Sequence, residues 1–154
     1  MYPFLLALHS LCRWLVLLSL LYAIYRAYRG WLGSRPFSAH DNTTRFVTAT
    51  IAHIQLVLGL WLYFTSPLID YFLHNYRACV HQRATRFFGM EHSTMMLTAI
   101  IVITIGSAMA KRKDTDRKKF KAMAIWYSIA LLILLINIPW PFSPFAGRPW
   151  VRGF

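Results

Sequence analysis

The chain has little charge for its size. Only 14% of its 154 residues are charged, acidic residues number just 5, and 57% of the residues are hydrophobic. Soluble domains usually carry charge on roughly a quarter of their residues. The composition therefore excludes an ordinary soluble domain and indicates a chain that lies mainly in lipid.

Cysteine is also scarce. Cys12 lies inside an apolar run and Cys79 in a polar connection, and neither has a second thiol at metal-ligand spacing. We therefore expect no disulfide framework and no thiolate metal site. The sequence also lacks an internal repeat, a hydrolase triad, a nucleotide-binding loop and an ion filter.

Long apolar runs are what the sequence does have. About 20 apolar residues span the roughly 30 Å of hydrocarbon in a bilayer. The runs cover residues 4–25, 46–64, 87–110 and 120–138. They predict four transmembrane helices in a single integral membrane domain that covers residues 1–154.

The first run does not resemble a signal peptide. It has no basic residue before its core and no small-residue cleavage site after it, and Arg13 interrupts it. We expect a retained helix.

The connections are short, which favours antiparallel neighbours. Asp41 or Asn42 can cap the second helix, which should end near Ser66-Pro67. The longest connection, 68–86, mixes apolar and polar residues and indicates a short interfacial helix. Trp140 and Trp150 are typical of interfacial anchors. The fold class expected is an all-α transmembrane four-helix bundle with up-down-up-down order, in which the first and third helices lie diagonally.

The net charge of +12 does not indicate nucleic-acid binding, because the basic residues gather at the ends of the apolar runs. The first and third connections hold most of them, which the positive-inside rule places in the cytoplasm. Both termini are then periplasmic, in a bacterial inner membrane. The basic residues of these two connections are Arg26, Arg29, Arg35, Arg45, Lys111, Arg112, Lys113, Arg117, Lys118, Lys119 and Lys121, against Arg77, Arg83, Arg86, Arg148 and Arg152 on the outer side.

Three histidines, His9, His53 and His92, lie inside the apolar runs. An ionisable side chain in lipid is costly and usually serves a function. A rise of about 1.5 Å per residue places His9 and His92 roughly 7 and 9 Å from the midplane toward the outside, and His53 about 3 Å toward the cytoplasm. His9 and His92 are therefore the natural pair.

Diagonal helices in a square bundle have axes about 11–14 Å apart, which suits a haem held by two imidazoles. Bis-histidine ligation favours electron transfer over oxygen chemistry. The alternatives are buried histidines bonded within the bundle, a proton relay, or a copper or zinc site formed by all three histidines.

Four further residues are candidates for contact with the cofactor. Arg13 follows His9 by one turn on the same helical face, and its charge needs a partner such as a haem propionate or Glu91. Met96 shares the face of His92, where filling the core is its simpler role. His53 could contact a quinone or relay a proton.

Four segments carry a resemblance to small four-span bacterial membrane proteins described as cytochrome b or cytochrome-b-like. The resemblance covers nearly the whole chain, and the first and third segments are the most specific. It implies a membrane protein with haem b in respiratory or quinone-linked electron transfer. The segments are His9-Ser10-Leu11-Cys12-Arg13-Trp14, Ala52-His53-Ile54-Gln55-Leu56, Gly89-Met90-Glu91-His92-Ser93-Thr94-Met95-Met96 and Ile138-Pro139-Trp140-Pro141.

The chain departs from large cytochromes b, which carry paired histidines on each of two helices for two haems. Here three helices carry one histidine each, so at most one bis-histidine haem fits. The function expected is an electron-transfer subunit rather than a stand-alone enzyme, within a larger respiratory complex or a homo-oligomer. The alternative is a non-catalytic accessory or assembly subunit of a membrane complex.

Overall fold

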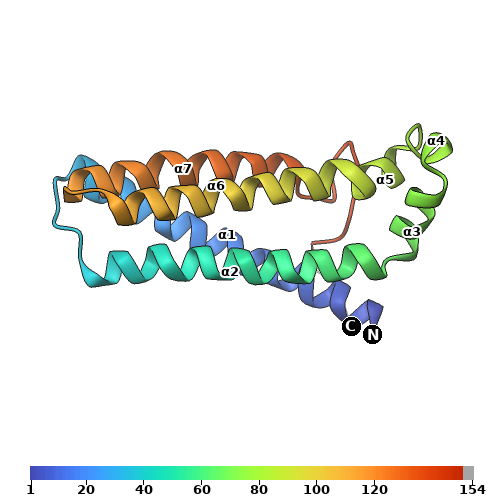
Figure 1. Ribbon diagram of the computed structural model, residues 1–154, viewed down its shortest axis with the longest axis horizontal. Coiled ribbons are helices and arrows are strands. Elements are labelled where there is room, and N and C mark those ends of the chain that lie inside the picture. The colour runs from blue at the N-terminus through green and yellow to red at the C-terminus, as the bar shows by residue number, and fades with distance from the viewer. Residues whose placement is uncertain (151–154) are drawn as a thin grey trace.

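The computed structural model describes residues 1–150, and this part of the chain is helical with no β-strand (Figure 1). Four helices are long and apolar enough to cross a membrane, as the sequence predicts. They are α1 (Tyr2–Leu32), α2 (Ala39–Thr65), the continuous helix Arg83–Arg112 and α7 (Asp116–Asn137). The third comprises α5 (Arg83–Arg86), a π-helical turn η1 (Phe87–Glu91) and α6 (His92–Arg112).

The four long helices pack in a ring. α1 packs against α2 and α7, and α6 packs against the same two neighbours. α1 and α6 therefore lie diagonally opposite, which confirms the predicted arrangement. The α1–α2 and α6–α7 connections lie at one end of the bundle, and the N-terminus and the short helices α3 and α4 lie toward the other (Figure 1).

The helices extend beyond the apolar runs because polar residues hold their ends. Ser38 forms a capping box with Asp41, so α2 begins at Ala39 rather than near residue 46. The expectation that Asp41 or Asn42 caps this helix is wrong. Asp41 is the third residue of the helix, almost fully buried, and its Oδ1 lies 2.6 Å from Arg26 Nη2. This ion pair ties α1 to the start of α2.

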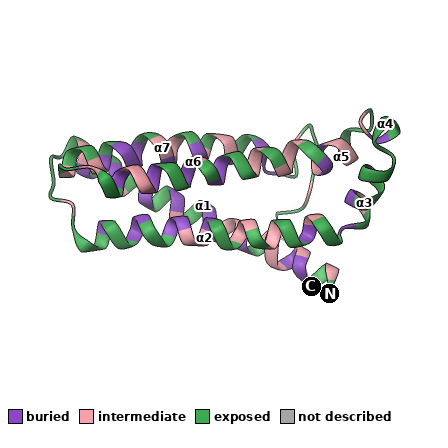
Figure 2. Cartoon of the chain, viewed as in Figure 1, coloured by how far each residue is buried: buried purple, intermediate pink, exposed green. Residues whose placement is uncertain are grey.

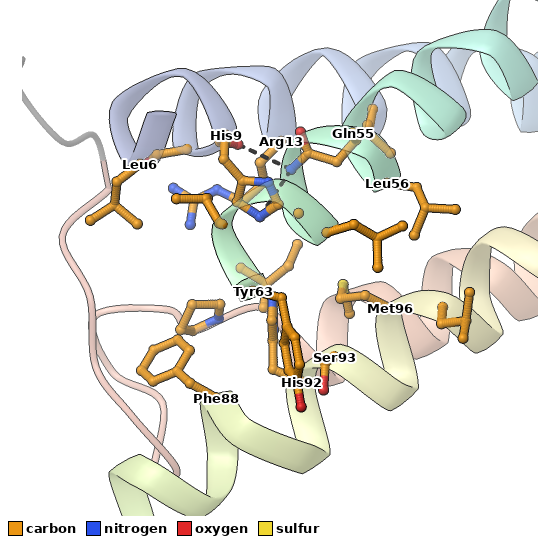
Figure 3. A pocket seen from close by; sticks show the side chains of 18 of the residues that line it. Leu6, His9, Arg13, Gln55, Leu56, Tyr63, Phe88, His92, Ser93 and Met96 are labelled. Atoms are coloured by element: carbon orange, nitrogen blue, oxygen red, sulfur yellow. Dashed lines mark hydrogen bonds between the residues drawn. The ribbon is translucent and has the colours of Figure 1, made fainter. Parts of the chain in front are cut away.

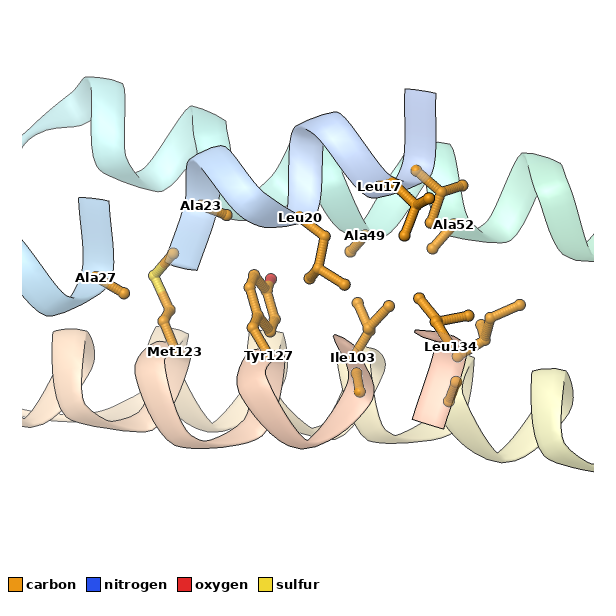
Figure 4. Close-up of a cluster of buried hydrophobic side chains, with 14 of the residues drawn as sticks. Leu17, Leu20, Ala23, Ala27, Ala49, Ala52, Ile103, Met123, Tyr127 and Leu134 are labelled. Atoms are coloured by element: carbon orange, nitrogen blue, oxygen red, sulfur yellow. The ribbon is translucent and has the colours of Figure 1, made fainter. Parts of the chain in front are cut away.

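The core runs along the bundle, from Ala27 and Met123 toward the end with the two connections to Leu17 and Leu134 toward the other end (Figures 2 and 4). Small residues dominate it, which allows close helix approach where lipid supplies no hydrophobic drive. Tyr127 is fully buried there and donates its hydroxyl proton to the Arg45 carbonyl. The core includes Leu17, Leu20, Ala23, Ala27, Ala49, Ala52, Ile103, Met123 and Leu134.

The outer connection contains the expected short helix, α3 (Pro67–His74), followed by one turn, α4 (Tyr76–Cys79). α3 turns Ile69 and Phe72 inward, and Phe72 packs where Gly89 has no side chain. Trp140 and Trp150 pack on protein rather than serving only as anchors: Trp140 donates to the Leu135 carbonyl, and Trp150 stacks on Trp14. Arg152 lies outside the described residues.

Gly106 lets α6 approach α7, because a Cβ there would overlap Trp126. We expect Gly106→Ala to lower the free energy of unfolding by about 1–3 kcal/mol, the usual effect of overpacking. Titration of the purified protein from mild detergent into dodecyl sulfate, followed by helicity, measures this. Ile101→Val, on an exposed position of the same helix, is the control and should change stability by less than about 0.5 kcal/mol. Equal midpoints for the two variants would contradict the packing argument.

Candidate functional site

A cavity of about 430 Å³ opens between the diagonal helices in the outer half of the bundle. α1 and α2 form one wall, with His9, Arg13 and Gln55, and α6 forms the facing wall, with His92 and Met96 (Figure 3). Pro139, Arg148 and Pro149, which follow α7, also line it. Sites for small ligands have volumes of roughly 300–1,000 Å³ and a mostly apolar lining with a few polar groups, and this cavity has both properties.

His92 is held by a hydrogen bond to the end of α7. Its Nδ1 lies 2.9 Å from the backbone carbonyl oxygen of Asn137. A carbonyl only accepts, so Nδ1 carries the proton, and in the neutral ring Nε2 carries the lone pair. Metal-binding histidines commonly have this arrangement, with one ring nitrogen donating to a carbonyl and the other bound to the metal.

His9 is held by Gln55 of α2. The Gln55 amide donates to the His9 carbonyl at 3.0 Å, and the same nitrogen lies 3.4 Å from His9 Nε2. An amide NH₂ group cannot accept a hydrogen bond, so in the neutral ring Nε2 is the acceptor and Nδ1 carries the proton. The second contact is longer than most N–H···N bonds, so a ligand could displace it readily.

Gly59 leaves room for the His9 ring. A Cβ at residue 59 would lie 3.2 Å from His9 Cε1, closer than usual van der Waals contact. The glycine therefore lets the imidazole lie close against α2.

Three buried polar atoms in this cavity have no hydrogen-bond partner within residues 1–150: His9 Nδ1, Arg13 Nε and Gln55 Oε1. Leaving a buried donor or acceptor unmatched costs about 1–3 kcal/mol, so such groups call for an explanation in a native structure. These three atoms gather at one wall of the cavity. This wall is therefore the part of the cavity where polar groups are available to a further partner.

Arg13 is hydrogen-bonded to the segment that follows α7. Its Nη2 donates to the Trp150 carbonyl at 2.6 Å, and its guanidinium lies over the Trp14 ring. Within the described residues it forms no ion pair with a carboxylate. The Arg13–Glu91 ion pair considered from the sequence is absent. Glu91, in η1, pairs instead with Arg86 at the end of α5, with 2.7 Å between Arg86 Nε and Glu91 Oε1. Glu91 is not among the residues that line the cavity.

His53 is separate from the other two histidines. It lies on an exposed face of α2, outside the cavity lining, and its Nε2 is 2.9 Å from Thr104 Oγ1 of α6. Within residues 1–150 no group of three or more metal-binding side chains forms. The three-histidine copper or zinc site is therefore wrong for this part of the chain. The depths estimated from the sequence also separate His53 from His9 and His92.

Several cavity residues escaped the sequence reasoning. Gln55 carried no predicted role. It lies on the face of α2 opposite to His53, and so it lines the cavity and holds His9. The Asn137 partner of His92 could not be predicted, because it is a backbone carbonyl that no pattern of side chains indicates. Tyr63 lies one turn beyond Gly59 on the same helix, and this spacing alone could have indicated it.

Tyr63 reaches across to the π-helical turn before His92. Its hydroxyl donates to the Gly89 carbonyl at 3.0 Å, across from α2 to η1. A π-helical turn displaces helix hydrogen bonds locally, and such turns often occur at functional sites. The bond fixes the turn that precedes His92 and so helps position that histidine.

Comparison with known proteins identifies no relative: no family model, no curated protein and no solved structure matches this chain.

Removing the Tyr63 hydroxyl should weaken the turn before His92. We expect Tyr63→Phe to lower the free energy of unfolding by about 1 kcal/mol, because the Gly89 carbonyl loses its side-chain donor. The same dodecyl sulfate titration measures the change. Tyr71→Phe is the matched control, because Tyr71 is half exposed on α3. An equal effect of the two substitutions would mean that the cross-helix bond contributes nothing.

Proposed function

We propose that this protein is an electron carrier that would bind one haem b in the cavity between α1 and α6, where His9 and His92 would hold it. The observation that carries the proposal is the placement of two imidazoles on facing walls of one cavity, between diagonal helices. In the neutral ring each one has Nε2 as its lone-pair nitrogen. When bound, haem would supply one-electron redox chemistry, and occupation of both axial positions favours electron transfer.

The donor set suits the rest of a haem as well. Arg13 and Arg148 line the cavity, and Arg13 Nε is buried without an acceptor within residues 1–150. Carboxylates such as the two haem propionates are good partners for a guanidinium. Met96, Leu97 and Ile100 offer apolar contact on the α6 wall. Arg13 would then hold the charged edge of the cofactor, and α6 would exclude water from its face.

His53 is the contact we assign to a lipid-soluble quinol. Thr104 Oγ1 donates its own proton to the Ile100 carbonyl at 2.7 Å, so it accepts from His53 Nε2. The neutral His53 ring is then left with a lone pair on Nδ1, in an exposed position within the span. An unmatched acceptor in lipid is unfavourable, and a quinol hydroxyl can donate to it. Its neighbours Ala52 and Leu56 line the haem cavity.

The proposed location is the inner membrane of a bacterium, with both termini on the periplasmic side. Lysines and arginines are concentrated at the bundle end with the α1–α2 and α6–α7 connections, which favours a cytoplasmic position for that end. The haem cavity then lies in the periplasmic half of the span. The protein would act as a subunit of a larger respiratory complex, which would take up the electrons, or as a homo-oligomer.

Purified protein from haem-replete cells should show a Soret band and sharp reduced α and β bands. His9→Ala and His92→Ala should each abolish the sharp reduced α and β bands, because one imidazole alone can hold haem only in a five-coordinate form. His81→Ala, in the exposed outer connection, is the matched control and should retain them. A colourless preparation of the wild type would reject the proposal and favour a non-catalytic accessory or assembly subunit.

His53→Ala should separate haem binding from reduction by quinol. We expect a normal haem spectrum and normal reduction by dithionite, with reduction by duroquinol about tenfold slower, the effect of losing one hydrogen bond. Stopped-flow absorbance at the α band measures both rates. Thr50→Val, one turn earlier on α2, is the control, since the Thr50 hydroxyl bonds within its own helix. If quinol reduces the His53 variant at the wild-type rate, His53 is not the quinol contact.

A further inference from the structure

Helix α7 ends at Asn137, immediately before the segment Ile138-Pro139-Trp140-Pro141. Ile138 has extended backbone angles, φ −70° and ψ 132°. A residue that precedes proline is excluded from the α-helical region by contact with the proline ring. Pro139 therefore fixes the point at which the helix ends.

The two prolines also remove two hydrogen-bond donors. In a continuing helix the carbonyls of Leu135 and Asn137 would accept from the backbone N–H groups of residues 139 and 141. Both of these residues are prolines and have no N–H. The carbonyls of Leu135 and Asn137 are therefore left without their helical partners.

Side chains replace both missing donors. The Trp140 indole N–H donates to the Leu135 carbonyl at 2.8 Å, and His92 Nδ1 donates to the Asn137 carbonyl at 2.9 Å. The first replacement is local. The second crosses from α6 to α7 and fixes which nitrogen of His92 carries the proton.

We propose that Pro139 and Pro141 act jointly as positioning residues for His92. By withholding backbone donors they reserve the Asn137 carbonyl for His92 Nδ1, which leaves Nε2 free for a ligand. The identity of that ligand as haem rests on the proposed function. The choice of which His92 nitrogen carries the proton does not.

The joint action leads to a non-additive expectation. In Pro141→Ala the helix still ends at Asn137, because Pro139 remains. In Pro139→Ala the helix can continue, but residue 141 still has no N–H to offer. Only Pro139→Ala/Pro141→Ala supplies both a helical path and a competing donor for the Asn137 carbonyl.

The test is ring-nitrogen NMR of the full-length protein without haem, labelled with ¹⁵N in its histidine side chains. His92→Gln assigns the His92 signals. We expect the Nδ1-protonated form in the wild type and in both single variants, and a several-fold rise in the Nε2-protonated form in the double variant. Pro144→Ala is the control and should match the wild type. Pro144 also follows α7, and its carbonyl accepts from Arg83.

A double variant with the wild-type His92 signals would overturn the proposal, and so would a shift in either single variant alone. If the double variant does not fold, the wild type still gives an answer. A through-hydrogen-bond coupling between His92 Nδ1 and the Asn137 carbonyl carbon is expected, and its absence would overturn the proposal.

Haem titration separates this inference from the proposed function. We expect the double variant to bind haem about tenfold to a hundredfold more weakly than the wild type, the usual effect of losing such a bond to a ligating histidine. A shifted protonation state together with a wild type that binds no haem would uphold the positioning of His92 and reject haem as its ligand.

Discussion

The structure depends on one constraint: polar groups inside a bilayer must find partners within the protein. Within residues 1–150, the buried side-chain polar atoms at the end of the bundle with the α1–α2 and α6–α7 connections all have partners. Arg45 is buried there, and its guanidinium donates to Asn42 and Ser107 while its carbonyl accepts from Tyr127, so α2, α6 and α7 are joined without an acidic residue. The outer half of the bundle does not meet this constraint. The polar atoms left unmatched there, on His9, Arg13 and Gln55, all face one cavity.

The contrast between the two halves reflects the residues at the helix contacts. Alanines and glycines such as Ala23, Ala27 and Gly106 allow close packing at the connection end. Toward the outer end larger polar side chains replace them, beginning with Arg13 on α1 and Gln55 on α2. The bundle is closely packed where small residues line the helix contacts and hollow where polar side chains do, so the cavity lies beside a closely packed region.

Much of the fold could be predicted from the sequence, because hydropathy and length determine the spans directly. The diagonal relation of α1 and α6 followed from the short connections, and the grouping of His9 with His92 followed from depth alone. The end of α2 near Ser66-Pro67 was predicted correctly, but its start could not be found this way, since Ser38 and Asp41 cap it beyond the apolar run. The partners of Glu91 and His92 could not be predicted from the sequence either. Arg86 competes for Glu91 through a turn whose π-helical geometry the sequence does not reveal, and His92 bonds to a main-chain atom.

The position in the chain of the segment that follows α7 has a consequence for biosynthesis. Residues on the cavity wall extend from Tyr2 to Pro149, and Arg13 bonds to the carbonyl of Trp150. The first helix enters the membrane long before these last wall residues leave the ribosome. During synthesis the polar atoms of α1 must therefore remain hydrated or borrow other partners. The cavity wall is complete only once residues 148–150 have been made, so a ligand that needs the whole wall binds after that point.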